Sequence, residues 1–277
     1  MNGLKLLSFS GKKKYIFVTM KGKAIVLGSG TSQGVPLIAC NCQVCSSNDL
    51  KDKRLRSSLL FHVDQKNYVI DAGPDFRQQM LRANVNDLEG ILFTHEHKDH
   101  IAGLDDVRAY NYRYNSHMDV FCTLEVENAL KREFSYIFNN DDYPGIPKIK
   151  LHQIDKAPFK LSHTCTIIPI QVNHYKMPVL GFRIGDFAYI TDAKTITKEE
   201  SDKLKGINIL IINALHQSKH ISHFNLEEAL AFIELIQPKK AYLTHISHLF
   251  GKHNDIQALL PPNVYPAYDG LEIDFNY

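Results

Sequence analysis

Four side chains of a metal-binding type lie within six positions of the chain, as His95, His97, Asp99 and His100. They come directly after the apolar run 90–93, which predicts a buried strand. Histidine is the commonest metal ligand among side chains, and neighbouring imidazoles would repel one another on charging, so a solvated polar turn is the weaker interpretation. We therefore predict a metal site at the end of this strand.

Three further polar residues stand just beyond apolar runs later in the chain, at His174, Asp192 and His245. Loops at strand ends can bring distant segments together around one pocket. Each of the three alone is a weak indication, because a lone histidine at a strand end is more often a hydrogen-bonded structural residue. Together with the cluster at 95–100 they predict a centre that holds more than one metal ion.

The donor types also indicate a reaction. Neutral imidazoles and carboxylates suit zinc, manganese and iron, so they do not select one ion. Two such ions about 3.5–4 Å apart can lower the pKa of a bridging water, supply hydroxide at neutral pH and stabilise charge on an attacked phosphorus or carbonyl centre. Hydrolysis without a nucleophilic side chain is therefore the leading prediction.

A second cluster contains three thiols within six residues, Cys40, Cys42 and Cys45. Three thiolates make up three quarters of a tetrahedral zinc site, and His248, three residues beyond His245, is the predicted fourth ligand. Three reduced cysteines in a core loop are the alternative, which the polar neighbours in 41–47 disfavour. A site closed by four protein ligands would be structural.

The elements that must position these residues alternate between strands and helices, and one α/β domain is the simplest interpretation. Residues 1–23 are lysine-rich and weakly patterned, so we treat them as an N-terminal extension of a domain that covers 24–277. Apolar runs and alternation predict strands at 24–27, 58–63, 68–71, 90–93, 166–170, 181–184, 187–190, 207–212, 240–244 and 270–275. Helical spacing and capping signals predict helices at 75–84, 101–107, 123–138, after Thr197, and from Asn225 to Ile236.

The glycine-rich segment 28–36 follows the first of these strands. A dinucleotide fingerprint would place glycine where Gln33 stands, and the Gly-Lys-Ser/Thr ending of a phosphate loop is absent. The segment is therefore not predicted to bind a nucleotide.

Composition is that of an ordinary globular protein. With 277 residues, 44% of them apolar, the chain can bury a sizeable core, and 22% charged residues with a net charge of +2 give no strong attraction to nucleic acid. No apolar stretch is long enough for a signal peptide or a membrane span, so a cytoplasmic location is the default expectation. Five cysteines, an odd number, indicate metal binding more than disulfides, with Cys122 and Cys165 predicted as core thiols.

The order of the predicted ligands resembles the signature of the metallo-β-lactamase superfamily of hydrolases, His-x-His-x-Asp-His followed by a histidine, an aspartate and a last histidine. The resemblance implies a four-layer αβ/βα sandwich, in which two mixed sheets carry helices on their outer faces. It also implies two divalent ions, one on His95, His97 and His174, the other on Asp99, His100 and His245, with Asp192 bridging them.

The cysteine triad indicates a resemblance to one particular group within this superfamily. A triad after a Gly-Ser-Gly-Thr-Ser-x-Gly-x-Pro loop, with a histidine beyond the last active-site histidine, is similar to the phosphoribosyl 1,2-cyclic phosphate phosphodiesterase group of the carbon-phosphorus lyase pathway. This implies one structural zinc on Cys40, Cys42, Cys45 and His248. The pyrroloquinoline quinone biosynthesis relative shares the triad but departs from the full histidine signature, which is intact in this chain.

The segment 222–225 resembles a Ser/Thr-His-x-Asn segment of the same group, in which the histidine assists departure of the leaving group. The resemblance implies that His223 is a general acid, a role that contributes roughly 10²–10⁴-fold to rate. His216 and His220 are alternatives, and a structural role before the helix is the other interpretation. The resemblance also implies that Asp99 shares acid–base duty.

The predicted function is hydrolysis of a small cyclic or activated phosphate diester by a hydroxide that bridges two metal ions. The predicted partner is a small-molecule phosphate ester and not a membrane, and a homodimer is compatible with the sequence. A tRNA 3′-end processing endonuclease is the first alternative, because such enzymes share the seven ligands. It is disfavoured by the mixed charge of the segment between His100 and His174, where 141–142 is acidic beside Lys148 and Lys150. A non-hydrolytic role like that of the quinone-biosynthesis relative is the second alternative.

Overall fold

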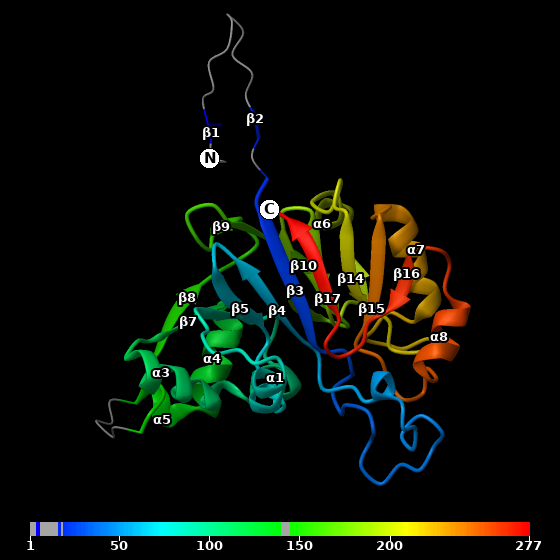
Figure 1. Cartoon of the computed structure of the whole chain (residues 1–277), viewed down its shortest axis with the longest axis horizontal. Helices are drawn as coiled ribbons and strands as arrows, with labels where there is room; N and C mark the ends of the chain where they lie inside the picture. The colour runs from blue at the N-terminus through cyan, green and yellow to red at the C-terminus, as the bar shows by residue number, and fades with distance from the viewer. Residues whose placement is uncertain (1–3, 6–15, 18, 140–144) are drawn as a thin grey trace, which may run out of the picture.

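The computed structural model describes residues 4–5, 16–17, 19–139 and 145–277 (Figure 1). Most of the predicted extension 1–23 lies outside the described residues, apart from the short antiparallel pair β1 (Leu4–Lys5) and β2 (Ile16–Phe17) and residues 19–23, in which the first strand of the sandwich already begins at Lys21. The acidic pair 141–142, which we used against tRNA binding, also lies outside them.

Two mixed sheets form the centre of the fold. The first has the order β17-β3-β4-β5-β6-β7-β8, with β3 Lys21–Gly28, β4 Ser58–Val63, β5 Lys66–Ile70, β6 Gly90–Leu92, β7 Met118–Cys122, β8 Ile149–Gln153 and β17 Glu272–Asn276. The second has the order β13-β10-β11-β12-β14-β15-β16, with β9 beside β10; its strands are β9 Phe159–Lys160, β10 Thr166–His174, β11 Met177–Ile184, β12 Phe187–Ile190, β13 Thr195–Ile196, β14 Ile209–Asn213, β15 Lys240–Thr244 and β16 Val264–Pro266.

Side-chain alternation along the strands explains why the two sheets pack face to face. On β4, Leu59, Phe61 and Val63 point into a core that both sheets share, whereas Leu60 points to the outer face. On β12, Phe187 and Tyr189 meet them from the opposite sheet.

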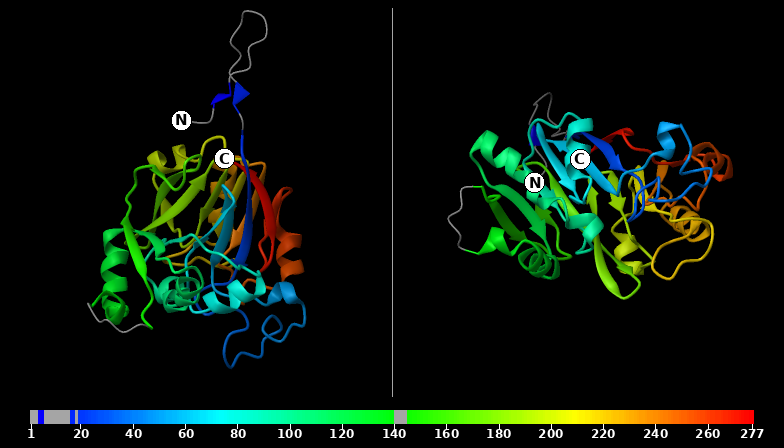
Figure 2. Two further views of the ribbon diagram at one scale, coloured as in Figure 1. Left: turned by 60° about the vertical axis from the view of Figure 1, so that its left-hand side comes forward. Right: turned by 90° about the horizontal axis from the view of Figure 1, so that it is seen from below.

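The outer faces are covered by helices, as Figures 1 and 2 show. The helices are α1 Phe76–Arg82, α2 Lys98–Ile101, α3 Arg108–Tyr114, α4 Leu124–Glu133, α5 Ser135–Phe138, α6 Lys198–Asp202, α7 Leu226–Ile236 and α8 His253–Leu259, with 3₁₀ turns η1 Leu50–Asp52 and η2 Leu104–Val107. Buried residues of α1, α2, η2 and α4 pack on the first sheet, and those of α7 and α8 on the second. The predicted four-layer sandwich is confirmed.

Strand direction determines where the polar segments meet. β5 and β6 are parallel in the first sheet, as are β12, β14 and β15 in the second. β10 is antiparallel to β11, which is antiparallel to β12, so β10 runs with this second group. Their carboxyl ends lie at one edge of the sandwich, the lower edge in Figure 1, which the right-hand view of Figure 2 looks onto.

Two predicted helices are interrupted. The segment 101–107 divides into α2 and η2 at Gly103, where a Cβ atom would lie 2.1 Å from the carbonyl oxygen of Gly73. The close backbone approach fixes this break. The predicted helix 123–138 divides at Phe134 into α4 and α5. In the described part of the chain, no helix is long and apolar enough to cross a membrane.

The start of α7 follows the sequence prediction closely. The side chain of Asn225 accepts from the backbone N–H of Glu228, and the Glu228 carboxylate accepts from the backbone N–H of Asn225, which completes a capping box. The equivalent Glu200 of α6 instead accepts from the backbone N–H of Gln171 and pairs with Lys203, so only half of that box forms.

We expect Asn225→Ala to lower the free energy of unfolding by about 1–2 kcal/mol, because the first turn of α7 would lose its cap. Urea unfolding followed by circular dichroism measures this. Glu227→Ala, at an exposed position of the same turn, is the control and should change stability by no more than about 0.5 kcal/mol. Equal stability of the two variants would contradict the role of the cap.

Candidate metal centre

The fold brings all seven predicted active-site ligands to one place. Residues 95–100 follow β6, His174 ends β10, Asp192 follows β12 and His245 follows β15. The ring centroids of His95 and His100 are 4.1 Å apart, those of His97 and His174 5.1 Å, and those of His100 and His245 6.1 Å. Residues up to about 150 positions apart in the sequence thus share one cluster.

The carboxylate of Asp192 lies at the centre of this cluster and is almost completely buried. Its Oδ2 is 3.4 Å from Nε2 of His100, and its Oδ1 is 3.4 Å from Nε2 of His245. Its two oxygens therefore face two different imidazoles of the cluster, and its predicted role as a bridge between two ions stays a prediction. On the other flank, Oδ2 of Asp99 lies 3.1 Å from Nε2 of His100.

Two of the histidines have their Nδ1 atoms tied to the protein. Nδ1 of His174 is 2.8 Å from the backbone carbonyl oxygen of Ser222 and must donate to it. Nδ1 of His245 is 3.1 Å from Oγ of Ser57, whose hydroxyl donates to the carbonyl of Gly30 and can therefore only accept from the ring. In both rings Nε2 is left with its lone pair, the tautomer that binds metal.

The buried carboxylate of Asp71 fixes the orientation of two more histidines. It accepts from the backbone N–H and the hydroxyl of Thr94, both at 2.8 Å, and from Nδ1 of His100 at 2.7 Å. The Thr94 oxygen, having donated its proton to Asp71, accepts from Nδ1 of His95 at 2.8 Å. Asp71 therefore orients His100 directly and His95 through Thr94.

His223 belongs to the same cluster. Its ring is buried, 4.4 Å from the ring of His174 and 4.7 Å from that of His245, and its Nδ1 lies 3.5 Å from Oδ1 of Asp192. The ring of His220 lies next to it, 5.1 Å away and tilted by 31°. His216 in turn lies 5.9 Å from His220. Of the three loop histidines, His223 is the one that reaches Asp192.

Within this centre, two groups of side chains have converging donor atoms, and both groups include Asp192. One contains His95 and His100, the other His174 and His223, with all ligand atoms of a group within 4.8 Å of one another. His97 joins the first group through its Nδ1, 3.1 Å from Nε2 of His95. The division of the ligands between two ions that the resemblance implies stays a prediction.

Protonation favours cation binding. Burial lowers the pKa values of His95, His97 and His245, so these rings are neutral. Burial alone would raise the pKa of Asp192, but His245 and the other imidazoles around it outweigh that effect and hold the pKa well below its usual value. A centre of neutral imidazoles and ionised carboxylates is the donor set that divalent metals require.

His100 differs from these histidines, because its pKa is raised and not lowered. Burial would lower its pKa, but the carboxylates of Asp71, Asp99 and Asp192 outweigh burial and raise it well above the usual value. The ring therefore carries a proton that a cation at Nε2 would displace.

Unpaired buried nitrogens test whether a metal fits. In the part of the chain that the structure describes, Nε2 of His100, Nε2 of His245 and Nδ1 of His223 are buried and make no hydrogen bond. Buried polar atoms are normally paired, so three unpaired nitrogens facing two carboxylates require an occupant. A divalent cation satisfies the Nε2 atoms of His100 and His245, and the residues present fit the metal that the resemblance implies.

Left-handed backbone conformations turn the chain into this centre. Asp71, Asp192 and His245 have φ angles of 64°, 58° and 57°, and each stands within two residues of a strand end. Such a conformation is uncommon outside glycine and occurs often at functional sites. It redirects each chain across the edge of the sandwich.

Sequence reasoning missed Asp71 and Ser57 as site residues. The position of Asp71 directly after a strand, like that of Asp192 and His245, was the available signal. The glycine-rich loop also has a role, since Gly30 accepts from Ser57, and a Cβ atom at Gly28 would lie 1.9 Å from the carbonyl oxygen of Arg56. These glycines allow close backbone packing beneath His245.

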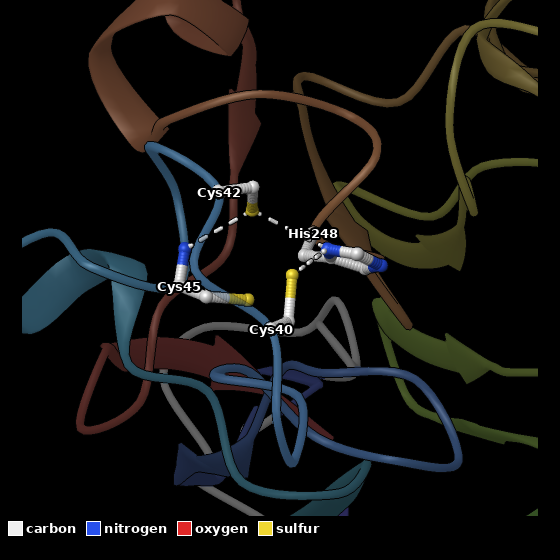
Figure 3. A group of neighbouring side chains, drawn as sticks. All are labelled: Cys40, Cys42, Cys45 and His248. Carbon is white, nitrogen blue, oxygen red and sulfur yellow. Dashed lines mark hydrogen bonds between the residues drawn. The ribbon is translucent and has the colours of Figure 1, made fainter.

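The predicted cysteine site also assembles. Cys40, Cys42, Cys45 and His248 point toward one another in Figure 3, with their ligand atoms within 4.8 Å of one another. Nδ1 of His248 lies 3.5 Å from the Sγ atoms of both Cys40 and Cys42. Ligands about 2.3 Å from a tetrahedral zinc would stand about 3.8 Å apart, so the group fits this ion.

The thiols of this site differ in acidity. The backbone N–H of Cys45, followed by the His248 ring, lowers the pKa of Cys42 to about 6, which makes it a thiolate at neutral pH. Burial raises the pKa of Cys45 to about 11, so its ionisation requires a cation beside it. Cys122 and Cys165 lie fully buried in the two cores that the first sheet borders, as predicted.

Comparison with known proteins agrees with the fold and with the ligand pattern. Residues 66–246 match the sequence profile of the β-lactamase superfamily domain. The chain is 40% identical over 253 residues to an octanoyltransferase of Porphyromonas gingivalis, an alignment that covers 90% of this chain but only 51% of that protein. It is 33% identical over 215 residues to coenzyme PQQ synthesis protein B of Methylobacterium nodulans, covering 69% of this chain and 72% of the relative.

A solved structure is similar to this chain in both fold and sequence. A diphosphatase from the PhnP family superposes with a TM-score of 0.88 and 36% sequence identity, over 94% of this chain and 99% of the diphosphatase. The profile match, the two mixed sheets and the converged histidines and aspartates together establish that the chain belongs to the β-lactamase superfamily and has the metallo-β-lactamase fold.

Proposed function

We propose that this protein is a metal-dependent phosphodiesterase that hydrolyses a small cyclic or activated phosphate diester. The observation that carries the proposal is the convergence of His95, His100, His245 and Asp192 with unpaired buried atoms facing inward. The hydrolase class follows from the superfamily and from the diphosphatase neighbour.

Two divalent ions, zinc or manganese with iron as the third option, would supply hydroxide at neutral pH and stabilise the charge that develops on the phosphoryl oxygens. The chain itself would hold them through His95, His97, Asp99, His100, His174, Asp192 and His245. Asp71, Ser57 and the Ser222 carbonyl keep the imidazoles in the binding tautomer.

His223 is the proposed general acid. Its Nδ1 lies 3.5 Å from Oδ1 of Asp192, close enough to the proposed metal centre to give a proton to a leaving group there. Burial lowers the pKa of His223 to about 2, so its ring is neutral in the free site. It would acquire a proton only with an anionic phosphate beside it, because a neighbouring negative charge raises the pKa of an imidazole. Asp99 would share the acid–base duty.

The names of the relatives bear on this proposal in different ways. Similarity to the diphosphatase supports hydrolysis at a phosphorus centre. The assignment to phosphate diesters is a further part of our proposal. Octanoyl transfer is not carried over, because the chain spans about half of the protein that bears that name. A tRNA endonuclease and a non-hydrolytic role like that of the PQQ synthesis protein are the alternatives.

A panel of assays separates these functions. Purified protein with measured metal content is assayed on bis-p-nitrophenyl phosphate, a cyclic nucleotide, a phosphoribosyl cyclic phosphate and precursor tRNA. We expect it to hydrolyse bis-p-nitrophenyl phosphate and at least one of the small cyclic diesters in preference to precursor tRNA. Cleavage of precursor tRNA alone would refute the proposal. An absence of all hydrolysis with the metal sites filled would favour the non-hydrolytic role.

His223→Ala should reduce kcat most for diesters with poor alkoxide leaving groups, by about 10²-fold or more, and least for p-nitrophenolate, because only a basic leaving group needs the proton. Metal content should stay unchanged. His220→Ala is the matched control, three residues earlier in the same loop and with its ring 5.1 Å from that of His223. An equal loss for both leaving groups would count against a general acid, and a loss of metal would make His223 a ligand.

We propose a structural zinc on Cys40, Cys42, Cys45 and His248, and Cys42→Ala tests it. One zinc per chain should be lost by elemental analysis, and the melting temperature should fall because metal binding contributes to folding. Ser46→Ala, an exposed position in the same loop, should leave both unchanged. Unaltered zinc content in Cys42→Ala would exclude the assignment.

A further inference from the structure

A pocket of about 430 Å³ opens at the same edge of the sandwich as the metal centre. It lies between the two sheets, where the segments after β7 and β8 face the β10–β11 hairpin. Its lining residues are His95, Glu96, Thr123, Leu124, Glu125, Val126, Gln153, Ile154, Asp155, Lys156, Gln171, Met177, Pro178 and Leu180.

The pocket borders the proposed active site. His95, one of the proposed ligands, forms part of its wall, and Met177 pairs in register with His174, another proposed ligand. A group attached to a phosphate at the metal centre would therefore lie next to this pocket. Two other hollows, of about 600 and 650 Å³, lie beside α1 and α3 and beside α6 and α7, and no proposed active-site ligand lines either of them.

The walls of the pocket are largely apolar. Val126, Ile154 and Leu180 are at most 9% exposed and form a packed floor, whereas Leu124 is 48% exposed and stands at the opening. Met177 and Pro178 complete the apolar surface from the opposite sheet. Apolar walls of this kind bind the apolar part of a ligand, and the polar groups beside them orient it.

The charges around the opening are mostly negative. Glu96, Glu125 and Asp155 contribute three carboxylates against the single ammonium of Lys156, and within the described residues that line the pocket there is no arginine. A second phosphate or a polynucleotide backbone would meet like charge here, and sites for such groups are normally rich in arginine and lysine.

We propose that this pocket receives the ester substituent of the substrate, and that this substituent is an uncharged, partly apolar alkyl or aryl group without a second phosphate. The inference rests on the proposed phosphodiesterase function and names the substrate class for it. It distinguishes this chain from an enzyme specialised for diphosphates or RNA, whose substrates carry further negative charge on the same side.

A series of p-nitrophenyl phosphodiesters with methyl, propyl, hexyl and 5-carboxypentyl substituents tests the proposal, because all four release the same p-nitrophenolate. Burial of a methylene group gives up to about a fourfold gain in binding. We expect kcat/KM to rise at least 10-fold from methyl to hexyl, and the 5-carboxypentyl ester to fall at least 10-fold below the hexyl ester.

Two variants connect these preferences with the pocket. Leu124→Ala should lower the hexyl-to-methyl ratio of kcat/KM at least threefold, and Leu81→Ala, an exposed leucine of α1, should leave the ratio unchanged. Glu125→Lys should raise kcat/KM for the carboxypentyl ester relative to the hexyl ester. Glu199→Lys, at the same second position of helix α6, is its matched control and should leave this ratio unchanged.

A binding measurement complements the kinetics. Hexylphosphonate should bind at least 10-fold more tightly than methylphosphonate by titration calorimetry, and Leu124→Ala should remove most of this difference. Equal kcat/KM for the methyl and hexyl esters, with equal binding of the two phosphonates, would overturn the inference while the phosphodiesterase function stands. No hydrolysis of any of the four esters would overturn both.

Discussion

The site depends first on a carboxylate buried away from water. Asp71 has no exposed surface, and a buried carboxylate is costly unless donors surround it. Three hydrogen bonds, two from Thr94 and one from His100, meet that requirement and in doing so fix the first and last histidines of the 95–100 segment. Burial of this carboxylate thereby orients the rings, because turning His100 would remove one of its three donors and turning His95 would break the hydrogen bond to the Thr94 oxygen.

The sandwich supplies the remaining geometry. Each sheet contributes strand ends to the same edge, so ligands from both halves of the chain meet without a long loop. Gly73 allows the turn after Asp71 to approach residues 99–100 closely, since a Cβ atom there would lie 2.0 Å from the carbonyl oxygen of Asp99. The backbone of the first sheet and the helix that carries Asp99 and His100 thus hold each other in register.

Local signals in the sequence predicted much of this arrangement. The ligand types and spacing at 95–100 and 40–45, the alternation of β4 and the capping box at Asn225 all depend on residues a few positions apart. Contacts between distant segments were not predictable in the same way. Ser57 and His245 are 188 positions apart, and no local pattern links them.

Tertiary packing also overrode some local signals. The Glu200 carboxylate accepts from the backbone N–H of Gln171 and does not complete a capping box. Close packing of Gly103 against Gly73 interrupts the helix that the periodicity of 101–107 predicted. The pocket beside His95 is formed by five separate segments of the chain, and no local pattern in any of them predicts a pocket.

The left-handed residues at 71, 192 and 245 have an evolutionary consequence. Such a conformation costs a residue with a side chain of the order of 1 kcal/mol relative to glycine, although aspartate tolerates it better than most. Glycine at these three positions would relieve that cost, yet it would also remove a carboxylate or imidazole from the centre. Selection for thermal stability alone would therefore erode the site, and the side chains at these turns mark where stability is exchanged for chemistry.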